Sequence, residues 1–186
     1  SQWRNGDLSG EVTLTSFIIW YVLSLILAVV NLPLTWRLFK ALPSRGYALS
    51  RPVGLLLWGY LFWLLTSLQL LHNDLAGQLV AFGLVLVLNL LALRGGHTKE
   101  LGAWIKANRR LILTTETLFL VAFGLWAVVR AANPAIIGTE KPMEMAFINA
   151  ILRSPTFPPI DPWLSGYAIS YYYFGYVLAA MLIRVS

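Results

Sequence analysis

The chain has 186 residues, of which 58% are hydrophobic and only 12% are charged, and its formal net charge is +6. A soluble domain carries roughly 25% charged residues, so this composition excludes an ordinary soluble protein and indicates a chain that has the bilayer as its solvent. Without cysteine, the chain has neither a disulfide framework nor a thiolate metal site. Its basic residues stand at the ends of apolar runs, which is typical of membrane orientation, so no nucleic-acid partner is expected.

Five apolar segments are long enough, at about 20 residues, to cross about 30 Å of hydrocarbon as helices. Helices are expected because open strands would leave backbone groups without hydrogen-bond partners in lipid. We therefore predict an all-α fold, a polytopic membrane helix bundle with about five transmembrane helices. The segments are residues 15–36, which Pro33 bends or ends, 53–71, 75–93, 111–132 and 164–183.

The basic residues predict how these helices are oriented. Ten of the fourteen fall on one side of the membrane: Arg37, Lys40, Arg45, Arg51, Arg94, Lys99, Lys106, Arg109, Arg110 and Arg184. By the positive-inside rule that side is cytoplasmic. We therefore expect an integral protein of the plasma, or inner, membrane, with the N-terminus and residues 133–163 outside. The start at Ser1 and the end after an apolar run suggest a piece of a longer protein.

Polar residues inside the apolar segments have a structural and a functional interpretation. Glu116 would cost about 2.5–3.5 kcal/mol on insertion scales, and buried acids in membranes are candidates for function, such as coupling in a transporter. Because it lies about one and a half turns from Arg110, we favour a structural role, in which Glu116 reaches the surface or pairs with the basic cluster. Four amides most simply join helices, at about 1 kcal/mol each or less: Asn31, Gln69, Gln78 and Asn89.

The external loop begins where Asn133-Pro134 ends the fourth segment, since proline cannot continue a helix. Residues 143–152 are predicted to form one short interfacial helix, too short to span, with Pro142 in its first turn. Glu140 and Glu144 are four apart and share a face of that helix.

Four prolines in residues 155–162 then make a stiff strap. We expect it to present Asp161 at the mouth of the fifth helix, where the helix dipole favours the ionised carboxylate, with Trp163 marking the interface. Two or three acids over the outer membrane surface can act as a general base, bind a divalent metal ion or hold a cationic partner. The simpler alternative is that these acids are only solvated.

The fifth segment opens with SGYAISYYYFGY, in which tyrosines are expected on two helix faces, Tyr167 with Tyr171 and Tyr172 with Tyr176. An aromatic belt at the outer interface is the simplest explanation. Tyr172, Tyr173 and Tyr176 reach deeper, however, so some hydroxyls should face protein or a cavity. A tyrosine-lined cavity under carboxylates suits a sugar, a lipid phosphate head group or a pigment tail.

Three runs carry a resemblance to a known family: GTEKPMEMAFINAILRS, FPPIDPW and SGYAISYYYFGY. They resemble the polytopic membrane family named for its Tyr-Tyr-Tyr (YYY) motif, known from Chloroflexus-like bacteria and archaea, over residues 111–186. That family is similar to the GT-C membrane glycosyltransferases, which use polyprenyl-phosphate sugars and carry acids and an interfacial helix in an external loop. The resemblance implies a three-helix membrane region, 1–110, followed by a GT-C-like helix pair with its acidic loop, 111–186.

The resemblance also implies roles for single residues. Glu140 or Asp161 would be the catalytic base or a metal ligand, and Lys141 and Arg153 would steady the donor phosphate. The full substrate-binding set that we predict is Lys141, Glu144, Arg153, Trp163, Tyr171, Tyr172, Tyr173 and Tyr176.

Two functions follow as hypotheses. The first is a membrane glycosyltransferase-like protein, or the N-terminal piece of one, using a lipid-phosphate-linked sugar at the external face. The alternative is a non-catalytic integral subunit of a larger respiratory or photosynthetic complex that contacts other membrane subunits, pigments or lipids.

Overall fold

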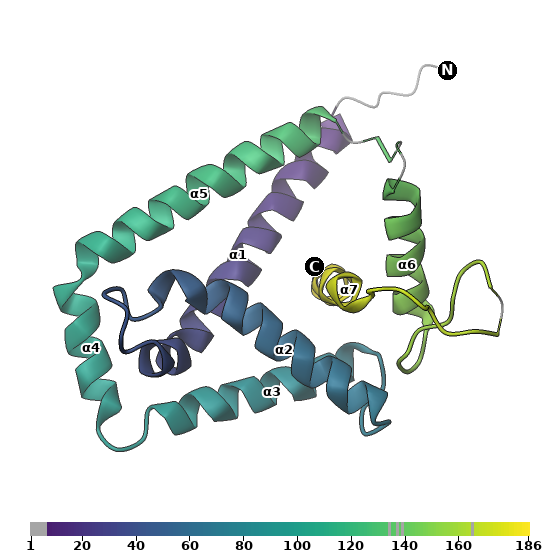
Figure 1. Cartoon of the computed structure of the whole chain (residues 1–186). Helices are drawn as coiled ribbons and strands as arrows, with labels where there is room; N and C mark the ends of the chain where they lie inside the picture. Colours follow the sequence, from purple (N-terminus) through teal and green to yellow (C-terminus); the bar gives the residue numbers. More distant parts are fainter. Residues whose placement is uncertain (1–6, 134, 137, 139, 165) are drawn as a thin grey trace.

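The computed structural model describes residues 7–133, 135–136, 138, 140–164 and 166–186, with side chains from Leu14 onward. Within these residues the chain forms α-helices and one short 3-10 helix, so the prediction of an all-α membrane bundle is confirmed (Figure 1). The bounds are α1 Asp7–Leu38, η1 Tyr47–Leu49, α2 Ser50–Ser67, α3 Leu75–Ala92, α4 His97–Ala107, α5 Arg109–Ala132, α6 Lys141–Arg153 and α7 Phe174–Val185.

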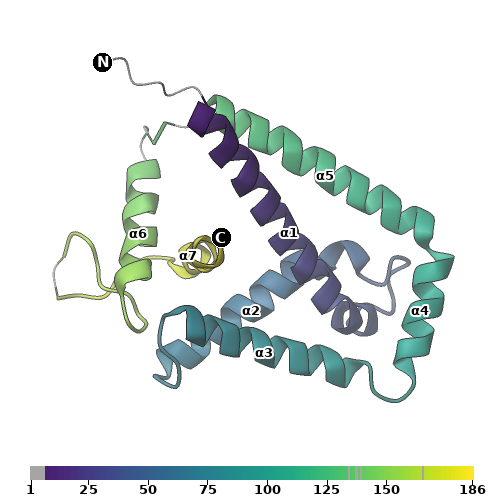
Figure 2. The same cartoon turned by 180° about the vertical axis from the view of Figure 1, so that it is seen from behind.

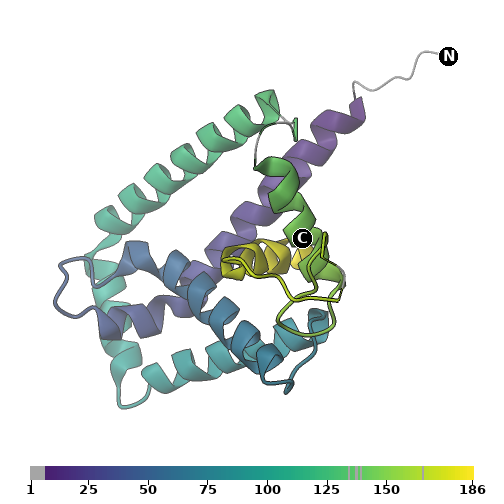
Figure 3. The ribbon, with the colours of Figure 1, turned by 45° about the vertical axis from the view of Figure 1, so that its right-hand side comes forward.

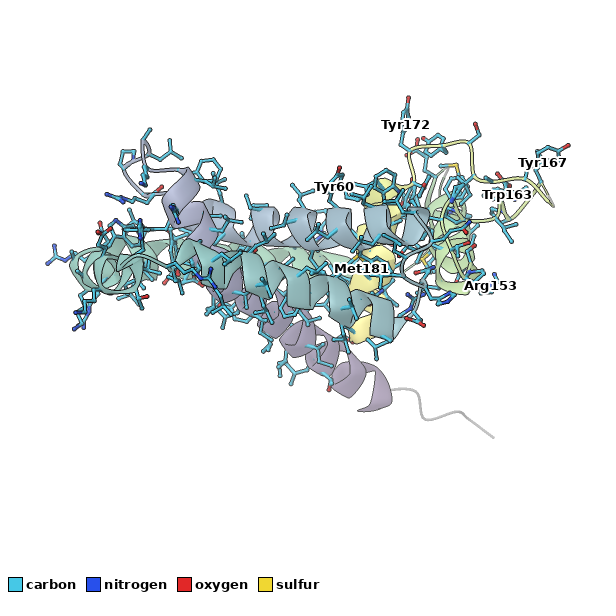
Figure 4. All side chains as sticks on the ribbon, turned by 90° about the horizontal axis from the view of Figure 1, so that it is seen from below. Tyr60, Arg153, Trp163, Tyr167, Tyr172 and Met181 are labelled. Carbon is cyan, nitrogen blue, oxygen red and sulfur yellow. The ribbon has the colours of Figure 1, made fainter. Side chains whose placement is uncertain are left out.

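Among the described residues, four helical segments are long and apolar enough to cross a membrane, and they overlap the first four predicted spans: Leu14–Leu38, Tyr47–Ser67, Leu75–Ala92 and Arg109–Ala132. Figure 4 shows the bundle extending from nitrogen-tipped side chains at one end to Trp163 and Tyr167 at the other. We call these the basic end, which carries residues 39–49 and 93–108, and the aromatic end, which carries α6 and residues 159–164 and 166–173. The positive-inside rule predicts that the basic end faces the cytoplasm.

Helix α1 continues through Pro33, and amide side chains join it to α3 at that point. The backbone N–H of Leu34 donates to Oδ1 of Asn89 at 3.1 Å, and Nδ2 of Asn89 donates to Oδ1 of Asn31 at 3.2 Å. Proline disturbs helical hydrogen bonding in its vicinity, so a side chain from α3 serves as the acceptor there. The predicted inter-helix role is confirmed for Asn31 and Asn89. The amide of buried Gln78, by contrast, has no hydrogen-bond partner within the described residues.

Glu116 of α5 pairs with Arg51 of α2, so the structural interpretation is confirmed with a partner other than the neighbouring Arg110. Nη1 of Arg51 donates to Oε1 of Glu116 at 3.1 Å, and a second contact joins Nη2 to Oε2. The Tyr47 hydroxyl donates to the same Oε1 at 2.8 Å. The guanidinium also lies over the ring of Phe119, 4.0 Å from its centroid. A local ion pair therefore accounts for this acid, and no coupling role is needed to explain it.

Helix α4 lies within the basic loop, where no helix is predicted. Its apolar residues Leu101, Trp104 and Ile105 follow helical spacing and pack against Leu32 and Trp36 of α1. The loop is therefore a helix docked on the basic end.

The predicted start of the fifth helix at residue 164 is wrong, because α7 begins only at Phe174 and has 12 residues. At 1.5 Å per residue it is about 18 Å long, which is less than the thickness of about 30 Å that a span must cross. Figure 1 looks nearly along α7, whereas α2 and α3 lie across the view, so α7 crosses the bundle. The two helices lie close together at Gly59 of α2, where an added Cβ would meet the Cδ2 atom of Leu178 of α7.

Arg184, near the end of α7, lies at the aromatic end of the bundle. Its Nη1 donates to Oδ1 of Asn73, in the turn between α2 and α3, at 2.9 Å. Its Nη2 donates to the carbonyl of Leu152, near the end of α6, at 3.1 Å. The prediction that Arg184 joins the cytoplasmic basic set is therefore wrong, because α7 is too short and too oblique to reach the basic end.

One hydrophobic core joins α1, α2, α3, α6 and α7. Its least exposed members include Phe62 of α2, Val85 of α3, Ile151 of α6 and Val177 of α7. Helices α6 and α7 therefore pack directly on the helices that precede them, and Figure 3 shows α7 between α2 and α6. Figure 2 shows from behind that helix α5 lies at the edge of the bundle. None of its residues is buried.

Candidate functional site

Helix α6 confirms the predicted short helix at residues 143–152 and provides the frame of the candidate site. Pro142 stands in its first turn, where a backbone N–H would have no partner within the helix. One face of α6 is buried through Phe147, Ala150 and Ile151, while Arg153 at its end is exposed. The helix is therefore seated on the bundle by its apolar face.

An aromatic cluster forms around Phe147, which is only 5% exposed. The ring of Trp163 meets it edge-on with centroids 5.3 Å apart, and the ring of Tyr171 stacks on it at 5.6 Å. Tyr176, in the first turn of α7, lies at 5.5 Å. Three of the predicted substrate-binding aromatic residues thus pack against the same side chain of α6, that of Phe147, and this packing holds their rings in place.

Asp161 shapes a loop and does not stand at a helix start. Its Oδ1 accepts the backbone N–H groups of Trp163 at 2.8 Å and Leu164 at 2.9 Å. The backbone N–H of Asp161 donates to the carbonyl of Tyr167. The adjacent residues Ile160 and Ala168 form an isolated antiparallel bridge. The expectation that a helix dipole acts on Asp161 is wrong, since α7 begins only after the tyrosine run. The carboxylate is occupied by turn hydrogen bonds of the kind aspartate commonly makes.

A groove of about 350 Å³ lies at the aromatic end, between α2 and the residues that lead into α7. Nε1 of Trp63 donates to the hydroxyl of Tyr173 at 3.0 Å, which ties the two walls together. Tyr172 is 87% exposed, and Figure 4 shows Tyr172 and Tyr60 on the same side of the molecule. Six aromatic side chains line the groove: Tyr60, Trp63, Tyr171, Tyr172, Tyr173 and Phe174.

The tyrosines reach this groove from a loop. The predicted pairing of Tyr167 with Tyr171, and of Tyr172 with Tyr176, on helix faces is wrong because Tyr167, Tyr171 and Tyr172 precede α7. The expectation that Tyr172 and Tyr173 line a cavity agrees with the groove. Sequence reasoning missed Tyr60 and Trp63. They stand three residues apart and so share one face of α2, which is the signal that could have identified them.

The acids of α6 lie near the start of α7. Glu140 is the exposed N-cap residue of α6, and Glu144 follows one turn later. Burial first, and then the charge of Glu144, the neighbouring Tyr171 and the charge of Glu140, raise the pKa of the Tyr176 hydroxyl above its ordinary value. Both carboxylates therefore act on the same end of α7 that adjoins the groove.

The predicted phosphate-binding cations are not brought together. Lys141 begins α6 and its Nζ donates to the carbonyl of Ala135 at 3.2 Å. Arg153 ends α6 and its Nε donates to the carbonyl of Asn149 at 3.3 Å. Twelve residues of helix separate their Cα atoms by about 18 Å. Within the described residues, no group of three or more histidine or acidic side chains could hold a metal ion.

Comparison with known proteins identifies a family. Residues 57–186 match the family described as "Uncharacterized membrane protein (DUF2298)". The matched stretch covers more than half of the chain and contains the whole groove, α6 and α7. No curated protein and no solved structure matches the chain.

Proposed function

The chain belongs to the membrane protein family DUF2298, and we propose that it binds a lipid-phosphate-linked sugar and acts as a glycosyltransferase-like protein at the aromatic end. The aromatic groove carries this proposal. Its volume of about 350 Å³ lies within the range of small-molecule sites. Tyrosine and tryptophan offer an apolar ring face together with a polar hydrogen-bonding tip, which suits a sugar with apolar faces and a rim of hydroxyls.

The acids of α6 would supply the base for such a transfer. The acceptor's hydroxyl oxygen bonds to the anomeric carbon while the bond from that carbon to the phosphate oxygen breaks, and the lipid phosphate leaves with the electron pair. The hydroxyl proton passes to a carboxylate. Of the two acids of α6 we choose Glu144, because it lies inside the helix and is half-buried, whereas Glu140 is the exposed N-cap residue. Asp161 is less suited, since its Oδ1 already accepts two backbone N–H groups.

A non-catalytic subunit of a larger membrane assembly is the second candidate function. Helix α5 favours it, because none of its residues is buried and Leu125, Trp126 and Val128 are each more than half exposed. A second membrane chain could cover this surface. In that case the groove would be filled or covered by a neighbour and would not bind a sugar.

Donor binding by the full chain in nanodiscs tests the proposal. Tyr60→Ala and Tyr172→Ala are each expected to weaken binding of a radiolabelled polyprenyl-phosphate hexose about tenfold, because an aromatic contact contributes about 1.4 kcal/mol. Tyr167→Ala is the matched control, since Tyr167 is exposed at the same end and lies outside the groove. Equal binding by Tyr172→Ala and Tyr167→Ala would contradict the groove as the donor site.

Transfer is measured separately from binding. Glu144→Gln is expected to bind the donor normally and to lose sugar transfer about 100-fold, because the neutral amide cannot accept the proton. Donor binding by the unaltered chain without any transfer to acceptors would instead favour the non-catalytic function.

A further inference from the structure

A second groove lies at the basic end, between the end of α1 and the end of α3, with a volume of about 490 Å³. Its apolar wall comes from both helices. Leu34 and Leu38 stand one turn apart on α1, and Leu88 and Leu91 have the same kind of spacing on α3. Two spanning helices thus turn leucine faces towards one groove, and the groove has no carboxylate among its lining residues.

Two cations complete the lining of this groove, Arg37 and Lys40. Nη1 of Arg37 donates to the carbonyl of Ala92 at 3.4 Å, which holds the guanidinium against the end of α3. Both cationic side chains are exposed. The ion pair in the part of the chain that the structure describes is that of Arg51 with Glu116, so neither groove cation is neutralised by an acid there.

We propose that this groove binds an anionic phospholipid of the surrounding membrane, with its phosphate at Arg37 and Lys40 and an acyl chain along the leucines. The proposal is independent of the function assigned to the aromatic end. Arg37 stands in the last turn of α1 and Lys40 in the turn that follows the helix, so the charges lie at the end of the apolar wall as a head group lies at the end of its acyl chain. Basic pockets between spanning helices on the cytoplasmic side suit anionic head groups.

The charges of the groove favour an anionic lipid over a zwitterionic one. An anionic lipid brings a net negative charge to two cations without an acid partner. A zwitterionic lipid has the same acyl chains and phosphate but adds a cationic choline that Arg37 and Lys40 would repel. The groove should therefore select phosphatidylglycerol over phosphatidylcholine, although both lipids fit its apolar wall.

Native mass spectrometry of the full chain, released from micelles that contain both lipids, tests the proposal. The unaltered protein is expected to retain phosphatidylglycerol in preference to phosphatidylcholine. The double variant R37Q/K40Q should weaken phosphatidylglycerol binding about 25-fold, since each cation near an anionic head group contributes about a fivefold factor. The double variant K99Q/K106Q is the matched control, because it removes the same charge from exposed positions of α4.

Two results would overturn the proposal. Equal loss in the two double variants would mean that the lipid responds to the total charge of the basic end, and unchanged retention by R37Q/K40Q would mean that the groove is not the site. Leu91→Trp gives an independent test, because it fills the apolar wall and leaves every charge in place. It should also lose phosphatidylglycerol, with circular dichroism verifying that the helices remain.

Discussion

Replacing Glu116 with leucine is expected to lower the free energy of unfolding by about 3 kcal/mol, since it leaves the buried charge of Arg51 without a partner. The charge left behind is that of Arg51, whose side chain is only 8% exposed. The Tyr47 hydroxyl would lose its acceptor in the same variant. Helix α5 should detach most readily, because it has no buried residue and this ion pair ties it to α2.

Reversible unfolding in mixed detergent micelles measures the effect. The double variant R51L/E116L should be more stable than Glu116→Leu alone, because removing both charges leaves neither unpaired. Glu100→Leu is the control for loss of an acid at the same end, and its exposed position on α4 predicts a change within about 0.5 kcal/mol. If the double variant were as unstable as the single one, the pairing of the two charges would not be the source of the loss.

Replacing Arg184 with leucine is expected to cost about 3 kcal/mol and to loosen α6 and α7 from the bundle. The guanidinium donates to Asn73 and to the carbonyl of Leu152, and hydrogen bonds from a charged donor contribute about 1.5 to 3 kcal/mol each. Asn73 in turn donates through Nδ2 to the carbonyls of Ile151 and Ser154. A single arginine therefore joins the turn before α3, the end of α6 and the end of α7.

Hydrogen exchange in the full chain distinguishes this network from a general effect of charge. Faster exchange is expected at the backbone N–H of Asn73, which donates to the carbonyl of Pro155 across the same junction. Arg153→Leu is the matched control, since it makes the same substitution at an exposed position nearby. Equal exchange rates in the two variants would show that Arg184 does not hold the junction.

The spans could be predicted because each is a local property of the chain. Length and hydropathy are sufficient for α1, α2, α3 and α5, and proline placement adds α6. The fifth helix could not be placed in the same way, because residues 164–173 have a helix-compatible, aromatic-rich composition. Backbone bonds from Asp161 to Tyr167 and from Ile169 to Pro159 hold this region in a loop instead. Such hydrogen bonds across a loop override the helical preference of the local sequence.

Several residues of the candidate site could be predicted from the sequence, but the way they come together in space could not. The tyrosine run and the α6 acids could be identified from the sequence, because polar and aromatic residues are concentrated there between apolar segments. The opposite wall of the groove depends on Trp63 reaching Tyr173, which is 110 positions away in the sequence. Asp161 was chosen as a site residue because prolines surround it. In the structure these residues form a turn, in which the carboxylate of Asp161 accepts a backbone N–H group.

The most direct test of the aromatic groove as a donor site is a high-resolution map of the full chain in nanodiscs with a polyprenyl-phosphate hexose. We predict sugar density against the rings of Tyr171 and Tyr172, with the anomeric carbon on the side of Glu144. Donor density elsewhere, or a groove covered by a neighbouring chain with Glu144 in water, would contradict the proposed function and leave a structural subunit.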